Sequence, residues 1–186
     1  MTANTSPADV IGFWMEAGHQ RWFSKDEAFD AEIRARFEAV HHAAARRELD
    51  HWAATAEGAL ALLILLDQFP RNLYRGSAHA FATDPLAHSL AERALDAGFD
   101  RAVDPVLRPF FYLPFEHSER PEDQARCVAL CEGHHEATGD AGTLDWARTH
   151  QDIIARFGRF PHRNACLGRE STPEELAFLA EGGFSG

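Results

Sequence analysis

The chain has 186 residues, of which 45% are hydrophobic and 11% aromatic, enough to bury the core of one globular domain. It carries 18 Lys and Arg against 29 Asp and Glu, a formal net charge of -11. This charge argues against general nucleic-acid binding, because most of the surface would repel phosphates. The longest apolar run, ALALLILL at 59–66, is far shorter than the roughly 20 residues of a membrane span, so we expect a soluble protein.

The N-terminal segment and the cysteines bear on where the protein is located. The N-terminal segment MTANTSPADVIGFW has no basic stretch followed by a long apolar one, so we expect no signal peptide. The three cysteines, Cys127, Cys131 and Cys166, are an odd number in a chain large enough to need no disulfides. This usage predicts a reducing, cytoplasmic location.

Four helix starts are marked by a capping residue followed by proline, at Ser6, Asp84, Asp104 and Thr172. Glu175 lies three residues after Thr172 and completes a capping box. Between these starts the apolar residues recur at helical spacing, and no run alternates like a strand. We predict helices at 7–17, 26–47, 58–69, 85–97, 104–112, 121–138, 145–157 and 173–181.

The predicted fold is all-α, with about eight helices in antiparallel pairs. The connections are short and contain no Ser/Gly-rich linker, which favours a bundle or a short helical solenoid. We expect a single helical domain over residues 1–186, with flexible ends at 1–5 and 182–186.

Two segments resemble each other: LLILLDQFPRN at 62–72 and DIIARFGRFPHRN at 152–164. In both, a predicted helix runs into Phe-Pro, and proline disfavours helical backbone in the residue before it. We therefore expect each helix to end there. Asn72 and Asn164 follow, and asparagine suits a turn because it tolerates the left-handed conformation.

The second of these segments lies in a strongly basic stretch. From Trp146 to Arg169 the chain has five arginines and one acidic residue, Asp152, so the local charge is five minus one, or +4. Two explanations stay open. The arginines pair with carboxylates of other helices, or they gather an anion in a cleft, since the guanidinium binds carboxylate and phosphate in bidentate fashion.

A second polar cluster is FYLPFEHSER at 111–120. Its residues 116–119 are consecutive, so their side chains fan apart and form no catalytic chain without partners from elsewhere. His150, His162 and Asp67 are candidate partners. For Asp67 the alternative is an ion pair with Arg71, four residues later.

Histidine and cysteine raise the question of a metal. Cys127, Cys131, His134 and His135 share one helix face, but this spacing is also that of a buried stripe. A set of His117, His150 and His162 with a carboxylate is the other possibility. No tight zinc pattern is present, so we predict no metal, and we expect His41, His42 and His51 to be solvated.

Five phrases in order resemble one known family: FW at 13–14, WF at 22–23, LLDQFPRNLYRG at 65–76, FYLPFEHSE at 111–119 and RFGRFPHRNACLGRESTPEE at 156–175. Together they resemble the bacterial family catalogued as domain of unknown function 924. The resemblance implies a tetratricopeptide-like fold, a right-handed stack of helix pairs, in a soluble single-domain protein. It implies no established reaction and no known cofactor.

The sequence thus predicts a polar cleft, lined by Arg, His and Asn, that binds a small anionic molecule, with hydrolysis or transfer as the chemistry if there is any. The predicted catalytic residues are His117, His162 and Glu119. The predicted ligand-binding residues are Asp67, Arg71, Asn72, Arg75, His150, Arg156, Arg159, Arg163 and Asn164. The alternative is a protein-interaction module that binds an acidic peptide on a concave surface. Neither the ligand nor the oligomeric state follows from the sequence.

Overall fold

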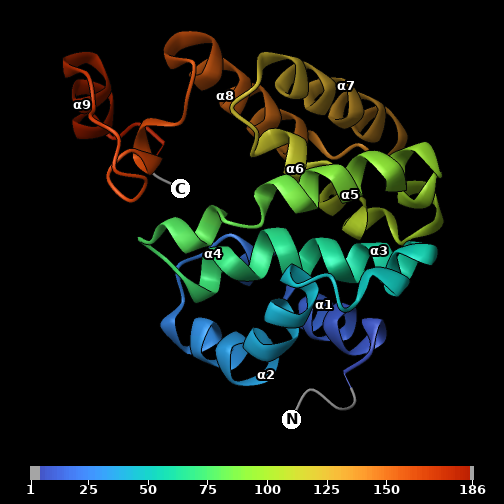
Figure 1. The fold of residues 1–186 in the computed structure, drawn as a ribbon. Coiled ribbons are helices and arrows are strands. Elements are labelled where there is room, and N and C mark those ends of the chain that lie inside the picture. Colours follow the sequence, from blue (N-terminus) through green and yellow to red (C-terminus); the bar gives the residue numbers. More distant parts are fainter. Residues whose placement is uncertain (1–4, 185–186) are drawn as a thin grey trace. The chain divides into compact units, whose positions relative to one another are not determined.

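The computed structural model describes residues 5–184, which contain helices and no strand (Figure 1). This confirms the all-α prediction, whereas the tetratricopeptide-like stacking stays a prediction. Most of the ends predicted to be flexible, 1–4 and 185–186, lie outside the described residues. Within the described part no helix is both long and apolar enough to cross a membrane.

The chain forms two compact units, described separately below. Unit 1 comprises the described residues up to Arg75 together with His79–Pro114, and unit 2 comprises Gly76–Ala78 and the described residues from Phe115 onward. This division does not test the predicted single domain. The α-helices are α1 (Pro7–Trp22), α2 (Glu27–Ala45), α3 (Ala56–Leu63), α4 (Phe69–Leu73), α5 (Asp84–Asp96), α6 (Leu113–Glu116), α7 (Pro121–Thr138), α8 (Ala141–Phe157) and α9 (Pro173–Ala180). Short 3-10 helices lie at Asp50–Ala54, Ala78–Phe81, Phe99–Ala102, Pro105–Phe111 and Pro161–Arg163, and a π-helical turn at Ile64–Gln68.

Three of the four predicted caps are confirmed. Ser6 and Thr172 each close a capping box, and the Asp104 carboxylate accepts from the Val106 amide at 2.9 Å. Asp104 starts a 3-10 helix instead of the expected α-helix, because Pro109 removes an amide from its middle. The cap at Asp84 is wrong: this residue is already inside α5, and its carboxylate pairs with Arg71 at 3.0 Å.

Helix α3 is central to unit 1, where it packs against α1 and α5 (Figure 1). Every residue from Ala59 to Leu66 is buried, so the helix is apolar on all sides. Aromatic rings of α1, α2 and α4 fill the space beside it. Phe13 stacks on Phe29 with 5.4 Å between ring centroids, and the Phe37 and Phe69 rings are tilted with centroids 5.1 Å apart. In unit 2, α7 and α8 lie side by side (Figure 1).

The prediction that the first Phe-Pro ends its helix is wrong. The chain passes through a π-helical turn, in which the Phe69 amide donates to the carbonyl of Ile64 five residues earlier, and continues helically as α4. Pro70 has no N–H, so carbonyls of the preceding turn lose their usual donor. Three side chains donate to them instead: His41 Nδ1 to Leu65 (2.8 Å), Thr83 to Leu66 (2.5 Å) and Arg71 to Asp67 (2.5 Å).

Two further expectations fail at these segments. Asn72 lies within α4 and makes no turn, whereas Asn164 does lie in the turn that follows Pro161–Arg163, although with φ -57° and ψ -49° it is right-handed and not left-handed. His41 is buried, with 4% of its surface exposed, so it is not solvated. Its predicted exposure was wrong because its partner, the Leu65 carbonyl, becomes available only through the proline 29 positions away in the chain.

Burial lowers the pKa of His41, and this exceeds the opposing effect of its bond to Leu65. The groups around it are His42, Glu38 and His79. In the unfolded chain His41 takes up a proton below about pH 6.5, whereas in the folded chain it takes one up only at a lower pH. His41 therefore lowers the stability of the folded protein as the pH falls below about 6.5.

We expect wild type to lose more stability than His41→Asn between pH 7.5 and 5.0. Asparagine can keep a donor near the position of Nδ1 but does not titrate. Urea unfolding at both pH values measures the difference. Equal losses in the two proteins would show that His41 accepts its proton in the folded state.

The end of α2 has an unusual backbone. Arg47 has φ 65°, the only positive φ of a residue other than glycine in residues 5–184. The Arg47 amide donates to Ala44 and the Glu48 amide to Ala43, which is the hydrogen-bond pattern of a Schellman motif. Glycine is the usual residue at this position, because the left-handed conformation costs other residues about 1 kcal/mol. The Arg47–Asp50 pair is solvent-exposed, and exposed pairs rarely offset such a cost.

Arg47→Gly should therefore raise the midpoint of thermal unfolding, by about 2 °C for a chain of this length. Differential scanning calorimetry measures it, with Arg46→Gly as the control, since Arg46 has an ordinary φ of -81° and loses stability on this change. A lower midpoint for Arg47→Gly would show that the Arg47 side chain stabilises the fold more than its backbone strains it.

Candidate functional site

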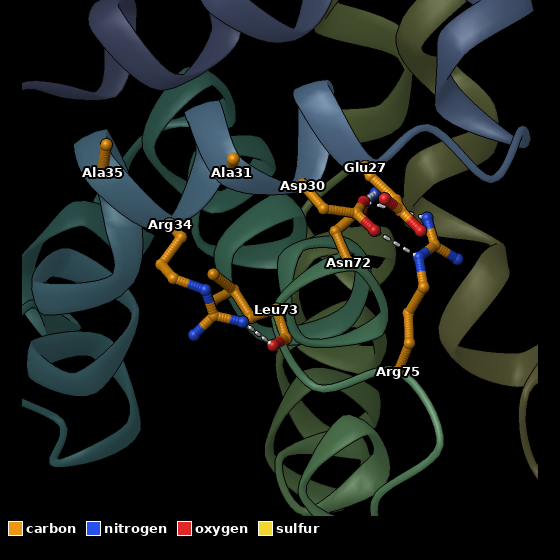
Figure 2. A pocket seen from close by; sticks show the side chains of 8 residues that line it. All are labelled: Glu27, Asp30, Ala31, Arg34, Ala35, Asn72, Leu73 and Arg75. Atoms are coloured by element: carbon orange, nitrogen blue, oxygen red, sulfur yellow. Dashed lines mark hydrogen bonds and ion pairs between the residues drawn. The ribbon is translucent and has the colours of Figure 1, made fainter.

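An open pocket of about 460 Å³ lies in unit 1 between α2 and the segment that follows the π-helical turn. Figure 2 shows the side chains that line it, from α2 on one side and from α4 and the residues after it on the other. The lining residues are Glu27, Asp30, Ala31, Arg34, Ala35, Asn72, Leu73 and Arg75.

The α2 side of the pocket follows from helical geometry. Its five lining residues recur at intervals of three and four, so they share one face of the helix. The opposite face carries Phe29, Ile33 and Phe37, which are buried in the core of unit 1. The pocket face is therefore the polar side of an amphipathic helix.

Asp30 organises the wall of the pocket. Its carboxylate accepts from Asn72 Nδ2 at 2.8 Å and from Arg75 Nε and Nη2 at 2.6 and 3.0 Å, as Figure 2 shows. Arg75 Nη2 also donates to the Ser24 carbonyl at 3.3 Å. These bonds fix the Arg75 guanidinium in one orientation at the edge of the pocket.

Arg34 is the second guanidinium of the pocket. It donates to Glu38 at 2.9 Å and to the Leu73 carbonyl near the end of α4, and its side chain is 49% exposed. Arg34 Nε and Arg75 Nη1 have no hydrogen-bond partner among residues 5–184. The two arginines thus retain donors for a bound group.

Of the four ligand residues predicted in this part of the chain, the structure brings Asn72 and Arg75 to the pocket. Asp67 is buried and pairs with Arg71 at 3.4 Å, which confirms the alternative of an ion pair. Arg71 also donates two hydrogen bonds to the Asp84 carboxylate, of 3.0 and 3.1 Å. Neither Asp67 nor Arg71 lines the pocket.

In unit 2 carboxylates bind the arginines of the arginine-rich segment, and we call each such arginine–carboxylate cluster a clamp. Arg159 forms two bonds to Glu175, of 2.6 and 2.8 Å, and one to the Glu170 carbonyl. The Glu175 side chain is only 2% exposed and also accepts from Asn164 Nδ2 and the Thr172 amide. The hydrogen bonds from Arg159 lower the pKa of Glu175 to about 2. Burial opposes this shift, and the bond from the Thr172 amide adds to it. Glu175 therefore stabilises the fold above about pH 4.5, and this stabilisation is lost as the pH falls toward 2.

A second clamp holds the predicted catalytic residue Glu119. Burial alone would raise its pKa, but bonds from Arg169 at 2.7 and 3.0 Å and from the Phe160 amide at 2.8 Å lower it. Arg163 donates to the His117 carbonyl at 2.9 Å and lies over the Phe160 ring. Arg156 pairs with Glu174 at the surface.

In unit 2 the rings of His150 and His162 pack against the same two phenylalanines, Phe160 and Phe184. His150 Nδ1 is 2.9 Å from the Trp146 carbonyl and 3.4 Å from the Glu116 carboxylate, and the side chains of His150 and Glu116 are buried. The His162 ring packs against Phe160 and Phe184. His117 takes part in the second clamp through its carbonyl. The proposed proton-transfer roles of His117 and His162 stay predictions.

The cysteine face of α7 is buried, with Cys127 Sγ 3.9 Å from Cys131 Sγ. A hydrogen bond with the Cys131 thiol, burial and the nearby Glu116 carboxylate raise the pKa of the Cys127 thiol well above its ordinary value. These thiols therefore behave as small hydrophobic groups. Among the described residues no three His, Cys, Asp or Glu are grouped so as to hold a metal ion.

Sequence reasoning missed the α2 side of the pocket, namely Glu27, Asp30 and Arg34. Their spacing showed an exposed helix face, but exposed faces of this kind are common on soluble helices. No local signal indicates that a second segment lies over this one.

The structure thus defines an all-α protein with a polar pocket that contains two arginines in unit 1 and a clamped arginine network in unit 2. The chain belongs to a family of bacterial proteins of unknown function, DUF924, whose model matches residues 10–183. This confirms the family indicated by the sequence phrases.

A solved structure of a protein of unknown function from Agrobacterium tumefaciens is similar to this chain, with 52% sequence identity and a TM-score of 0.88. The match covers 95% of this chain and 97% of the other. Among curated proteins, none matches.

The two arginine pairs that join the end of α8 to α9 offer a matched test of the clamp. Arg159→Ala should lower the thermal midpoint by roughly 5–10 °C, because it leaves the buried Glu175 carboxylate without its main partner. Arg156→Ala should change it by at most about 2 °C, since Arg156 and Glu174 are 53% and 62% exposed. Calorimetry of both variants checks this. Equal shifts would contradict the clamp.

Proposed function

We propose that the pocket between α2 and α4 binds a small anionic molecule through Arg34 and Arg75. The observation that carries the proposal is that two guanidinium groups, each oriented by bonds to the protein, line one pocket and keep unused N–H donors. Fixed guanidinium groups bind carboxylate and phosphate oxygens with little loss of side-chain entropy. Asn72 supports the site by bonding to Asp30.

The acidic residues of the pocket limit the ligand. Two arginines and two carboxylates, Glu27 and Asp30, line it, so the formal charge of the lining is zero. A highly charged anion would be repelled by Glu27. The pocket therefore suits a molecule with one or two anionic groups and at least one hydrogen-bond donor for Glu27.

The proposal concerns binding. The lining has no histidine, cysteine or serine, so hydrolysis or transfer would need groups other than those of the pocket. The predicted catalytic residues His117, His162 and Glu119 lie in unit 2, and their participation is a separate hypothesis.

Thermal unfolding with phosphate, succinate and aspartate as probes tests the proposal. A probe at a hundred times its Kd adds about 2.7 kcal/mol to the free energy of unfolding, which should raise the midpoint by roughly 5–10 °C. Arg34→Ala should abolish the shift. Arg36→Ala is the matched control, because it lies on the same helix, is 48% exposed and also pairs with a glutamate four residues away. A shift retained in Arg34→Ala, or no shift with any probe, would refute this site.

The second candidate is an interaction module for an acidic peptide. Trp146 and Leu176 in unit 2 are 55% and 57% exposed, and exposed tryptophan is typical of binding surfaces. Exposed Arg156 could supply charge complementarity. In calorimetric titration with a ten-residue glutamate peptide, this candidate predicts binding that Arg156→Ala weakens and Arg34→Ala leaves unchanged.

A further inference from the structure

A second pocket, of about 260 Å³, lies in unit 1 and shares no lining residue with the first. It is bounded by the C-terminal end of α2, the 3-10 helix Asp50–Ala54, α3 with the π-helical turn that follows it, and α5. The lining residues are Ala44, Arg47, Asp50, Ala53, Leu62, Leu66, Leu86, Leu90 and Arg93.

The lining combines four leucines with charged side chains. Leu62, Leu66 and Leu90 are buried, and Leu86 is half-buried. Leucine side chains offer no hydrogen bonds to water, so an apolar group gains by replacing water there. An apolar cavity of about 150 Å³ holds benzene, so this pocket has room for roughly ten non-hydrogen atoms.

Three charged side chains line the pocket beside the leucines. Arg47 pairs with Asp50 at 2.7 Å, and Arg93 donates to Ser89 Oγ at 2.8 Å. Two arginines minus one aspartate give these residues a charge of +1, in a chain whose net charge is -11. The charged part of the lining is therefore complementary to a single negative charge.

The backbone of Arg47 is a second, independent observation. It occupies a left-handed position at which glycine would be unstrained. A glycine there would complete the same Schellman motif but would remove one of the two guanidinium groups of this pocket. Strained residues of this kind gather at ligand sites.

We propose that this pocket binds a small carboxylic acid with an apolar body of about five to eight carbons. The leucines hold the apolar body, and the guanidinium groups of Arg93 and Arg47 hold the carboxylate. Phosphates and nucleotides do not fit this site, because they would place polar groups against the leucines.

Hexanoate, with eight non-hydrogen atoms, is the probe. Calorimetric titration of the full chain should give a Kd of roughly 0.1–1 mM. 1-Hexanol, which has a similar apolar body but no charge, should bind about tenfold more weakly. Acetate should not bind, since it lacks the apolar body. Absence of hexanoate binding, or equal binding of hexanol, would overturn the proposal.

Variants locate the site. Arg93→Ala should weaken hexanoate binding about tenfold, and the exposed Arg46, which does not line the pocket, gives the control Arg46→Ala. Leu86→Trp should fill the pocket and abolish binding, and Leu86→Phe serves if the larger residue impairs folding. Hexanoate binding that none of these changes affects would place the ligand elsewhere and overturn the proposal.

Arg47→Gly separates binding from stability. It should weaken hexanoate binding several-fold while the protein without ligand unfolds at the same or a higher temperature. Arg34→Ala, in the first pocket, should leave hexanoate binding unchanged, so that the two proposals fail independently. Unchanged affinity in Arg47→Gly would remove Arg47 from the site and contradict the reason given for its backbone.

Discussion

The organisation of unit 1 depends on a proline in the middle of a buried helix. Pro70 leaves carbonyls at the end of the α3 segment without their helical donors, and a buried unpaired carbonyl is costly. The structure meets this demand with side chains from other elements: His41 of α2 and Thr83 before α5. The same proline that weakens the helix therefore ties it to its neighbours on two sides.

The π-helical turn also determines where the following residues point. A turn of this kind adds one residue to the helix, and each residue of an α-helix rotates the chain by about 100°. After this rotation Asn72 faces Asp30 of α2, and Arg75 reaches the same carboxylate. The first pocket is thus a consequence of the proline as much as of its own polar residues.

Arginine serves two purposes in this chain, and its partners distinguish them. In unit 2, Arg159 and Arg169 each form two hydrogen bonds to one carboxylate. Without Arg159 the buried Glu175 carboxylate would be an unpaired charge, which lowers the stability of the fold. The +4 charge counted along 146–169 is therefore largely neutralised by glutamates from outside that stretch. In unit 1, Arg34 is half exposed, and its bonds to Glu38 and to the Leu73 carbonyl orient the guanidinium without using its Nε donor.

The sequence predicted what depends on neighbouring residues and failed where distant ones decide. Capping boxes at Ser6 and Thr172 involve residues three positions apart, and the structure has both. The expected helix end at Phe69 was wrong because the side chains of Thr83 and His41, 17 and 24 positions from the carbonyls that they bind, satisfy groups that proline leaves open. Asn72 and Arg75, which were predicted to bind a ligand, line the pocket. Asp30, which positions both, lies more than 40 residues earlier, on a helix face whose sequence pattern is that of an ordinary solvated face.

Two departures from regular backbone in unit 1 border the pockets, whereas a third, the kink of α1 at Gly18 (φ 70°, ψ 169°), lines neither of them. The π-helical turn leads into the first pocket and contributes Leu66 to the second, whose lining includes the left-handed Arg47. Each departure lowers stability, and a continuous α-helix or a glycine would avoid the cost. In a protein whose net stability is only several kcal/mol, features of this kind persist where they position groups that regular structure cannot. The binding roles proposed for the two pockets would account for the persistence of both departures at these positions.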